Sequence, residues 1–295
     1  MRKTLIYMLC EAAKSNSSLY LLVGDLGWSV VEPFMKQYPN QFFNIGVAEQ
    51  NMVGVGAGLA SEGSHVFAYS IGSFPTWRCA EQLRNDVDYH NLSYTTVTVG
   101  SGVAYGKLGY SHHAIQDIAL MRSLPNTLML CPCDPLETQA CISFILSNPS
   151  PSYLRLHKEG EPIITTKSSI LPCELNYIRK CGSKKLVLST GVSIHDFLEL
   201  ASEDFEGCDV ATLPIWNSKH GKTLVDAVDR YDVIYTLEDH LISGGFGSWV
   251  FEQFQLHSKA LSPRPTPSIL CKYLSSDVIG LVGDPSYIKS IAQVF

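Results

Sequence analysis

Short apolar runs alternate with longer stretches of helical pattern along most of the chain. The apolar runs, which are typical of strands buried on both faces, lie at residues 20–23, 42–45, 66–70, 94–99, 127–131, 185–189, 209–213 and 233–237. The helical stretches lie at residues 1–15, 48–62, 75–89, 115–123, 134–147, 194–201 and about 245–254. Strands that alternate with helices at this spacing indicate βαβ units and a parallel sheet.

The alternation weakens near the middle of the chain. Between residues 155 and 182, Gly160, two prolines and several polar residues interrupt the pattern, which indicates a linker with room for a hairpin. The length of 295 residues suits two domains, each with its own core. We therefore expect an α/β fold with two domains, each a mostly parallel sheet flanked by helices. The expected ranges are 1–158 for the first domain, 159–180 for the linker and 181–295 for the second domain.

Composition narrows the classes of function. Charged residues make up 17% of the chain, below the usual value of about 25%, which suggests that a partner covers part of the surface. The net charge of −6 comes without a cluster of Lys and Arg, so we expect no nucleic-acid partner. No apolar run approaches the ~18–20 residues that span a bilayer, so we expect no membrane segment either.

The cysteines bear on the compartment. There are nine, an odd number, and the first residues do not form a secretory signal, so we expect reduced thiols and a cytoplasmic protein. Cys131-Pro-Cys133 is a C-x-C pair with no second pair at metal-binding spacing. We interpret these two as small buried residues and expect no metal site in this chain.

Four polar or glycine-rich segments follow the expected strands. They are Gly24-Asp25-Leu26-Gly27, the run from Asn44 to Met52, the run Gly109-Tyr110-Ser111-His112-His113 with its continuation through residues 117–126, and Glu238-Asp239-His240 leading to Gly247. The carboxyl ends of parallel strands are where open α/β sheets build ligand sites. These segments are therefore the places where we look for catalytic and ligand-binding residues.

In this order and spacing, the four segments resemble the transketolase superfamily of thiamine diphosphate enzymes. That superfamily also includes deoxyxylulose-phosphate synthases and the β chains of 2-oxoacid dehydrogenases. The resemblance covers nearly the whole chain but only the later two-thirds of a full transketolase. It implies a pyrimidine-binding domain followed by a transketolase C-terminal domain.

The resemblance implies a catalytic role for Glu49. A family glutamate at this position hydrogen-bonds N1′ of the cofactor's aminopyrimidine and favours the tautomer that takes the proton from C2 of the thiazolium. This chemistry needs a carboxyl group in a dry pocket, because water would weaken and disorient the bond. Without its flanking motif, Glu49 would be interpreted as a helix-start carboxylate favoured by the helix dipole.

The resemblance also implies further cofactor contacts. Phe74 and Trp77 match an aromatic pair that stacks on the aminopyrimidine, and their i, i+3 spacing lets both face one pocket. Ordinary core aromatics are the alternative, and Trp77 is the weaker match. Asp25 and Leu26 match an Asp-Leu near the thiazolium, although an aspartate in a strand-end turn is a fair alternative.

The histidine segment is expected to face the substrate. The resemblance implies that His112 is catalytic and contacts substrate oxygens, since a neutral imidazole can donate to a developing alkoxide. It also implies that His113 and Arg155 bind substrate, with Arg155 holding a phosphate or carboxylate. Arg155 could instead be a solvated residue at a strand end. Lys107-Leu108 replaces the acidic pair usual in transketolases, which puts the usual sugar-phosphate set in doubt.

A part of the family's site is missing from the sequence. Members bind Mg²⁺ and the diphosphate through a Gly-Asp-Gly segment followed by an asparagine, and no such segment occurs; Gly283-Asp284-Pro285 has too little chain after it. We therefore expect thiamine diphosphate in a shared site. A separate N-terminal subunit would bind the diphosphate and would supply most of the ligands of the Mg²⁺ ion. This chain would self-associate within an α₂β₂ heterotetramer.

The leading interpretation is a subunit of a split transketolase in carbohydrate metabolism. It would transfer a two-carbon ketol unit from a ketose or ketose phosphate to an aldehyde acceptor. The alternatives within the enzyme class are a deoxyxylulose-phosphate-synthase-like subunit and a 2-oxoacid dehydrogenase β-type subunit. An alternative of another class is a non-catalytic scaffold paralogue.

Overall fold

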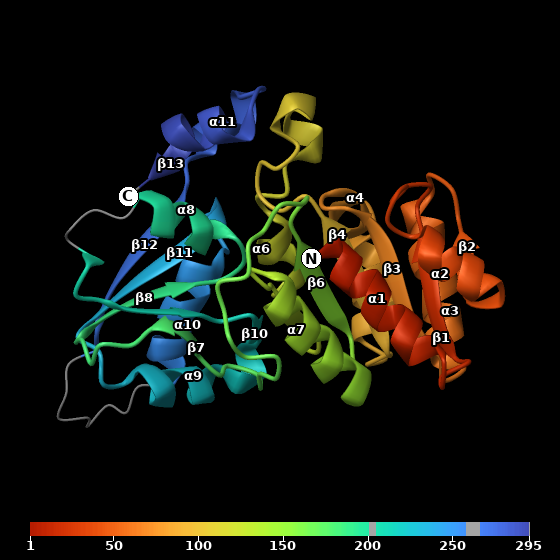
Figure 1. Cartoon of the computed structure of the whole chain (residues 1–295), viewed down its shortest axis with the longest axis horizontal. Helices are drawn as coiled ribbons and strands as arrows, with labels where there is room; N and C mark the ends of the chain where they lie inside the picture. Colours follow the sequence, from red (N-terminus) through yellow and green to blue (C-terminus); the bar gives the residue numbers. More distant parts are fainter. Residues whose placement is uncertain (201–204, 258–265, 295) are drawn as a thin grey trace.

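Two sheets with helices packed on them form the chain, in a computed structural model that describes residues 1–200, 205–257 and 266–294. One sheet lies in each half of the molecule, and the two halves are in contact (Figure 1). Most strand pairs are parallel, and the antiparallel ones are at sheet edges. The α/β fold class predicted from the sequence is confirmed.

The first sheet has seven strands in the order β10-β5-β6-β4-β3-β1-β2. Their bounds are β1 Leu19–Val23, β2 Phe42–Asn44, β3 His65–Ile71, β4 Tyr94–Val99, β5 Leu128–Leu130, β6 Ser152–Leu156 and β10 Ile215–Trp216. Strands β3, β4, β5 and β6 are almost entirely buried, as expected for a parallel sheet that is covered on both faces.

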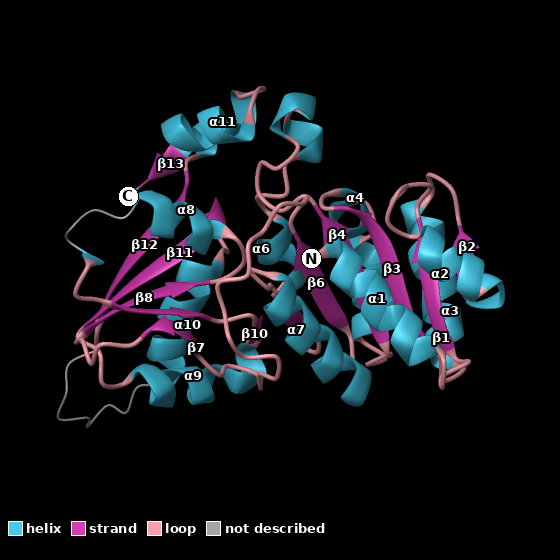
Figure 2. Ribbon diagram, viewed as in Figure 1, coloured by secondary structure: helices cyan, strands magenta, loops and turns pink. Residues whose placement is uncertain are grey.

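Helices cover both faces of this sheet (Figure 2). One face packs on α1 (Arg2–Ala13), α2 (Glu32–Gln37) and α7 (Pro135–Ser147). The other face packs on α3 (Glu49–Ser61) and on shorter helices. These are α4 Phe74–Trp77, α5 Ala80–Gln82, the π-helix η2 Leu83–Asp88 and α6 Asp117–Met121. The 3₁₀ turns η1 Pro39–Gln41, η3 Gly106–Leu108 and η4 Tyr110–His112 lie in the connecting segments.

The second sheet has six strands in the order β13-β12-β11-β8-β9-β7. Their bounds are β7 Asn176–Arg179, β8 Lys185–Ser189, β9 Asp209–Thr212, β11 Val233–Leu241, β12 Ser268–Leu274 and β13 Gln293–Val294. The helical elements that accompany them are α8 Ser193–Leu200, η6 Ser218–His220, α9 Gly221–Val228, α10 Phe246–His257, η7 Ser276–Gly280 and α11 Pro285–Ala292.

The two halves are joined by strand pairing and by a shared apolar cluster as well as by the linker. Strand β10 belongs to the second half of the sequence, yet it pairs with β5 at the edge of the first sheet. One apolar cluster runs from Met52 of α3 to Trp249 of α10 without a break at the boundary. Strand β7 lies inside the stretch expected as linker and belongs to the second sheet. The domain boundaries at 158 and 181 stay a prediction.

Several expected elements differ from the structure. The helix expected at 75–89 is divided into α4, α5 and the π-helix η2. The helix expected at 194–201 is found as α8, described from Ser193 to Leu200, and the last expected position, 201, lies outside the described residues. All nine cysteines are free thiols, and Cys131 and Cys133 are both buried. Within the described residues, no helix has the length and apolar character to cross a membrane.

Candidate functional site

The predicted site residues lie in the segments that follow the carboxyl ends of β1, β2, β3 and β4, except Arg155, which lies on β6 itself. Because these strands are parallel neighbours, their following loops meet at one edge of the sheet. This edge extends from the start of α3 toward the second half of the molecule.

Glu49 is a buried carboxylate at the first position of α3, with 1% of the residue exposed. An acidic group is favoured there by the helix dipole. Its Oε2 accepts a hydrogen bond of 2.7 Å from Nη1 of Arg78, whose side chain is half exposed. Gly24 keeps space open beside it, since a Cβ there would lie 3.8 Å from Glu49 Cγ and 3.4 Å from Ser70 Oγ. The hydroxyl of Ser70 is itself buried and has no partner within the described residues.

The Asp25 turn is fastened to the segment that leads into α3. Asp25 adopts a left-handed conformation with φ of 54°, which aspartate and asparagine tolerate better than most residues. Its backbone N–H donates to Asn44 Oδ1 at 3.0 Å, and Asn44 Nδ2 donates to Asp25 Oδ1 at 2.9 Å. The same Oδ1 of Asn44 accepts from the N–H of Gly46. Asp25 is exposed, and Leu26 is half-buried against the core.

Phe74 connects Glu49 to the histidine segment through Arg78. The guanidinium carbon of Arg78 lies 4.8 Å from the centre of the Phe74 ring, while the same side chain pairs with Glu49. The ring of Phe74 meets the ring of His112 edge-on at 5.1 Å between centroids. Glu49, Phe74 and His112 are therefore in one neighbourhood. Trp77 is half exposed and makes no ring contact with Phe74 in the described part of the chain, so its part in the aromatic pair stays a prediction.

The two histidines face different surroundings. His112 is half-buried at the end of η4, with its Nδ1 3.0 Å from Ser111 Oγ, and burial lowers its pKa below 6.5. His113 is buried near the backbone of Gly106, and neither of its ring nitrogens makes a hydrogen bond of good geometry within the described residues. Burial lowers the pKa of His113 as well. Both imidazoles are therefore mainly neutral at pH 7.

Arg155 is placed differently from the expectation. It is buried on β6, where its Nε donates to Asp117 at 2.7 Å and its Nη1 donates to Asp239 at 2.5 Å. Its Nη2 donates to the carbonyl of Ala114 at 2.7 Å. This geometry argues against the substrate-binding role expected for Arg155, because the guanidinium is already paired and shielded from solvent. Instead, Arg155 ties the first sheet to β11 of the second half.

The Glu238–His240 segment supports the start of α10. Glu238 accepts hydrogen bonds from the backbone N–H groups of Phe246 and Gly247 at 2.6 and 3.0 Å. Burial raises the pKa of Glu238 to about 8. His240 is buried beside Asp117 and donates from Nδ1 to the carbonyl of Leu241. These contacts give the segment a structural role at the start of α10.

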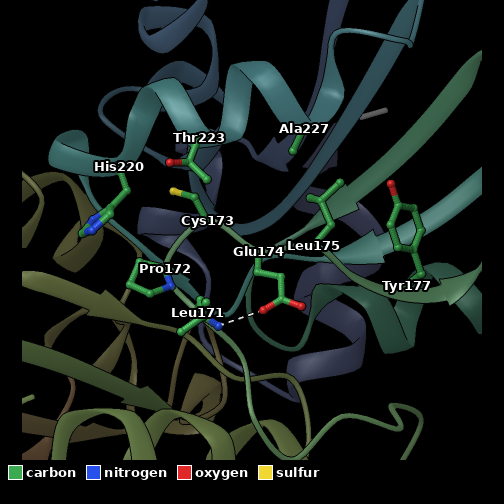
Figure 3. Close-up of a pocket in the computed structure, with 9 residues that line it drawn as sticks. All are labelled: Leu171, Pro172, Cys173, Glu174, Leu175, Tyr177, His220, Thr223 and Ala227. Carbon is green, nitrogen blue, oxygen red and sulfur yellow. Dashed lines mark hydrogen bonds between the residues drawn. The ribbon is translucent and has the colours of Figure 1, made fainter. Parts of the chain in front are cut away.

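Two further features lie outside this neighbourhood. A cavity of about 640 Å³ lies between the 171–177 segment and α9 with the preceding His220, and its lining is mostly apolar (Figure 3). None of the predicted site residues line it. Its acidic side chain, Glu174, is held by Lys167 and by the N–H of Leu171. Among the described residues, no three His, Cys, Asp or Glu side chains converge so as to hold a metal ion.

Comparison with known families decides the relationship. Residues 1–161 match the family described as the pyrimidine-binding domain of transketolase, and this stretch is more than half of the chain. The chain belongs to the transketolase family. The stretch that matches contains Glu49, Phe74, His112 and Arg155, together with the turn at Asp25.

Relatives in the transketolase family have a similar extent. A putative transketolase C-terminal section from Methanocaldococcus jannaschii is 33% identical, over 85% of this chain and 81% of the relative. A subunit of an apulose-4-phosphate transketolase from Actinobacillus succinogenes is 30% identical, over 85% of this chain and 82% of the relative. A solved structure described as the inactive β₄ tetramer of a split-gene transketolase is 29% identical, with a TM-score of 0.78 over 95% of this chain and 90% of that one.

Three side chains in the neighbourhood were not singled out from the sequence. Arg78 covers Glu49, Asn44 fixes the Asp25 turn, and Ser70 places a buried hydroxyl near Glu49. Asn44 lies inside the motif from Asn44 to Met52, so its position in that motif could have marked it as a site residue. Arg78 and Ser70 carry no such signal, because their importance depends on contacts across loops that are distant in sequence.

Proposed function

We propose that this chain is the pyrimidine-side subunit of a two-chain transketolase that depends on thiamine diphosphate. The observation that carries the proposal is the buried Glu49 carboxylate at the start of α3, close to Phe74 and His112, in a chain of the transketolase family. Family membership implies the cofactor. The relatives described as a C-terminal section and as a transketolase subunit support the division into two chains.

The residues present fit an aminopyrimidine ring. Glu49 offers a buried carboxyl group, and Phe74 offers an aromatic face. The hydroxyl of Ser70, which has no partner within the described residues, lies beside the space that Gly24 keeps open. Arg78 bridges Glu49 and Phe74, and its half-exposed side chain has room to turn outward. A flat ring between the carboxylate and the aromatic face would replace contacts that Arg78 makes here.

Each residue would have a distinct task. When bound, thiamine diphosphate supplies a carbon nucleophile and an electron sink. Glu49 would hold a ring nitrogen of the aminopyrimidine through a hydrogen bond that exclusion of water strengthens. His112, mainly neutral at pH 7, would donate a hydrogen bond to a substrate oxygen and take or return its proton. Asp25 and Leu26 would line the thiazolium side, and His113 would offer substrate its ring nitrogens, which make no hydrogen bond of good geometry within the described residues.

The proposed partner is an N-terminal subunit that binds the diphosphate and Mg²⁺. The surface around the site supports a missing partner, since large apolar side chains stand more than half exposed in the surrounding loops. These are Trp28, Val47, Trp77 and Leu108. We also propose that two copies of this chain associate, in line with the tetramer described for the solved relative.

We propose a ketose, free or phosphorylated, as donor and an aldehyde as acceptor. Two relatives named as apulose-4-phosphate transketolase subunits support a sugar phosphate. Lys107 and Leu108, both exposed on the η3 turn, stand where an acidic pair is usual, so the sugar hydroxyl would be recognised by other groups.

Subunit mixing tests the proposal. The chain alone, the diphosphate-binding chain alone and their equimolar mixture are assayed for ketol transfer with and without thiamine diphosphate. We expect cofactor-dependent turnover only in the mixture. Robust turnover by this chain alone would reject the two-chain site.

A donor screen on the same mixture separates the alternatives. Ketol transfer predicts product sugars without gas release. Release of CO₂ from pyruvate would instead indicate a synthase-like or dehydrogenase-like subunit. A mixture that binds the cofactor but turns over no donor would favour a scaffold.

A further inference from the structure

The loop that carries His112 packs against a segment near the C-terminus of the chain. This loop, residues 100–115, contains the short turns η3 and η4, whose hydrogen bonds are local i→i+3 contacts such as His112 N–H to Gly109 O. Its outer side is exposed at Lys107 and Leu108. The His112 loop therefore has little regular structure of its own to hold it in position.

Close packing joins the tip of the His112 loop to the C-terminal segment, residues 274–290. The N–H of Gly283 donates to the carbonyl of Gly106 at 3.1 Å. A Cβ atom added at Gly106 would lie 2.7 Å from Gly283 O and 2.7 Å from Ile288 Cδ1. Gly109, with φ of 76°, has Val282 Cγ2 3.2 Å from the position of a Cβ atom. Figure 1 shows α11 beside the yellow turns of this loop.

An apolar cluster continues this contact beneath the loop. Val103 and Ile115, near the two ends of the loop, pack in one buried cluster with Leu274, Val278 and Ile288. Both halves of the molecule thus contribute side chains to this one cluster, which is a small core separate from the main cores. Loss of one large member would leave a cavity that the others could not fill.

The C-terminal segment is itself anchored. Asp284 Oδ1 accepts the N–H of Ser286 at the start of α11, so the Gly283-Asp284-Pro285 motif is a helix start in this chain. Ser275 Oγ accepts the N–H of Asp277 at the start of η7. Lys289 Nζ pairs with Asp196 of α8 at 2.7 Å, and both side chains are largely buried. The segment can therefore act as a support.

The geometry points to the C-terminal segment as a positioning element for His112, with Gly283 and Ile288 as its contact residues. This inference rests on the proposed function, because it assigns the segment to the substrate side of that site. Ile288 touches neither the cofactor residues nor His112 itself within the described part of the chain. It acts through Gly106 and the η3 turn.

Ile288→Ala in the two-chain complex tests the inference, with Ile234→Ala in the buried core of β11 as the matched control. Both remove the same atoms from buried positions. We expect amide hydrogen exchange over residues 106–113 to quicken at least tenfold in Ile288→Ala only. We expect kcat/KM for ketol transfer to fall at least tenfold while the affinity for thiamine diphosphate stays unchanged. Ile288→Leu should restore both values.

A second pair of variants tests the inference even if Ile288→Ala does not fold. Gly106→Ala forces the loop away from Gly283 and from the Ile288 side chain while every side chain of the C-terminal segment is kept, whereas Gly280→Ala adds a methyl group in open space. Faster exchange in Gly106→Ala but not in Gly280→Ala supports the inference. Equal exchange in Ile288→Ala and Ile234→Ala would overturn it, whether or not the wild-type complex turns over. Absence of turnover in the wild type would count against the proposed function, while the exchange data would still decide the positioning role.

Discussion

At the scale of single residues, the candidate site depends on groups kept away from water. Glu49 is buried and paired with Arg78, whereas His112 is only half-buried beside Phe74. A partner chain that covers His112 would increase its burial. Its pKa would then move further in the direction that burial already sets.

The pH dependence of the complex follows from this burial. Because burial lowers the pKa of His112 below 6.5, the imidazole becomes half protonated only below that pH. We expect kcat/KM to fall as the pH is lowered, with the midpoint of this acid limb below pH 6.5. His112→Asn should remove this acid limb from the pH–rate profile. An acid limb centred above pH 6.5 that His112→Asn abolishes would contradict the prediction.

The sequence predicted part of this residue-scale picture. The motif around Glu49 and the aromatic Phe74 could be recognised locally, and the structure brings them together with His112. The surroundings of Arg155 could not be predicted, because its partner Asp239 is 84 residues away in the chain. A single sequence does not reveal such a pairing, so an arginine in a buried ion pair resembles an anion-binding residue at that level.

At the scale of elements, helix α3 lies very close to the sheet because of one glycine. A Cβ at Gly56 would lie 2.5 Å from the ring of Tyr94 and 3.1 Å from Val66 Cγ1. Gly58, two residues later, faces open space. Gly56 therefore sets how closely helix α3, which carries Glu49, packs on β3 and β4. Gly58 makes no such contact and only lowers the stability of the helix.

Alanine at these two positions should have opposite effects. Gly56→Ala forces Tyr94 or the helix to move, so we expect it to lower the free energy of unfolding by about 1–3 kcal/mol. Gly58→Ala restricts the unfolded chain and favours the helix, so we expect a gain of about 0.5–1 kcal/mol. Urea denaturation of the isolated chain measures both. Equal effects at the two positions would show that close packing at Gly56 is unimportant.

Elements that lack an apolar run escaped prediction. Strand β6 contains Ser152, Tyr153 and Arg155, yet it is wholly buried because neighbouring strands and α6 satisfy its polar groups. Strand β10 has two residues and exists only by pairing with β5 across the domain boundary. The strongly apolar strands β1, β3 and β4 were predicted, because burial on both faces leaves a local pattern.

At the scale of the whole molecule, the two halves share a buried network of charges. Arg155 of the first sheet is paired with Asp117 and with Asp239 of β11. Arg122, after α6, reaches the other half as well, with hydrogen bonds to Gly244 O and to Glu252 of α10. The His112 loop is thus held from below by Arg155, through the carbonyl of Ala114, as well as from its tip.

Removal of the central charge should therefore weaken the whole molecule. Arg155→Met leaves two buried carboxylates without their cation, and we expect a loss of about 3–5 kcal/mol in the free energy of unfolding. Arg84→Met, at an exposed position, should cost less than about 0.5 kcal/mol. Denaturant unfolding measures both. A stable Arg155→Met variant with a raised KM for donor would restore the substrate-binding role.

The most direct measurement is the activity of Glu49→Gln in the two-chain complex, with Glu62→Gln as control. Glu62 lies exposed at the other end of the same helix, so the two variants differ in site and not in chemistry. Glutamine keeps the size of the side chain but cannot exchange a proton, so we expect kcat to fall by about 10²–10⁴-fold. Glu62→Gln should match the wild type. Near-wild-type turnover by Glu49→Gln would contradict the account, because it would remove Glu49 from the shared site.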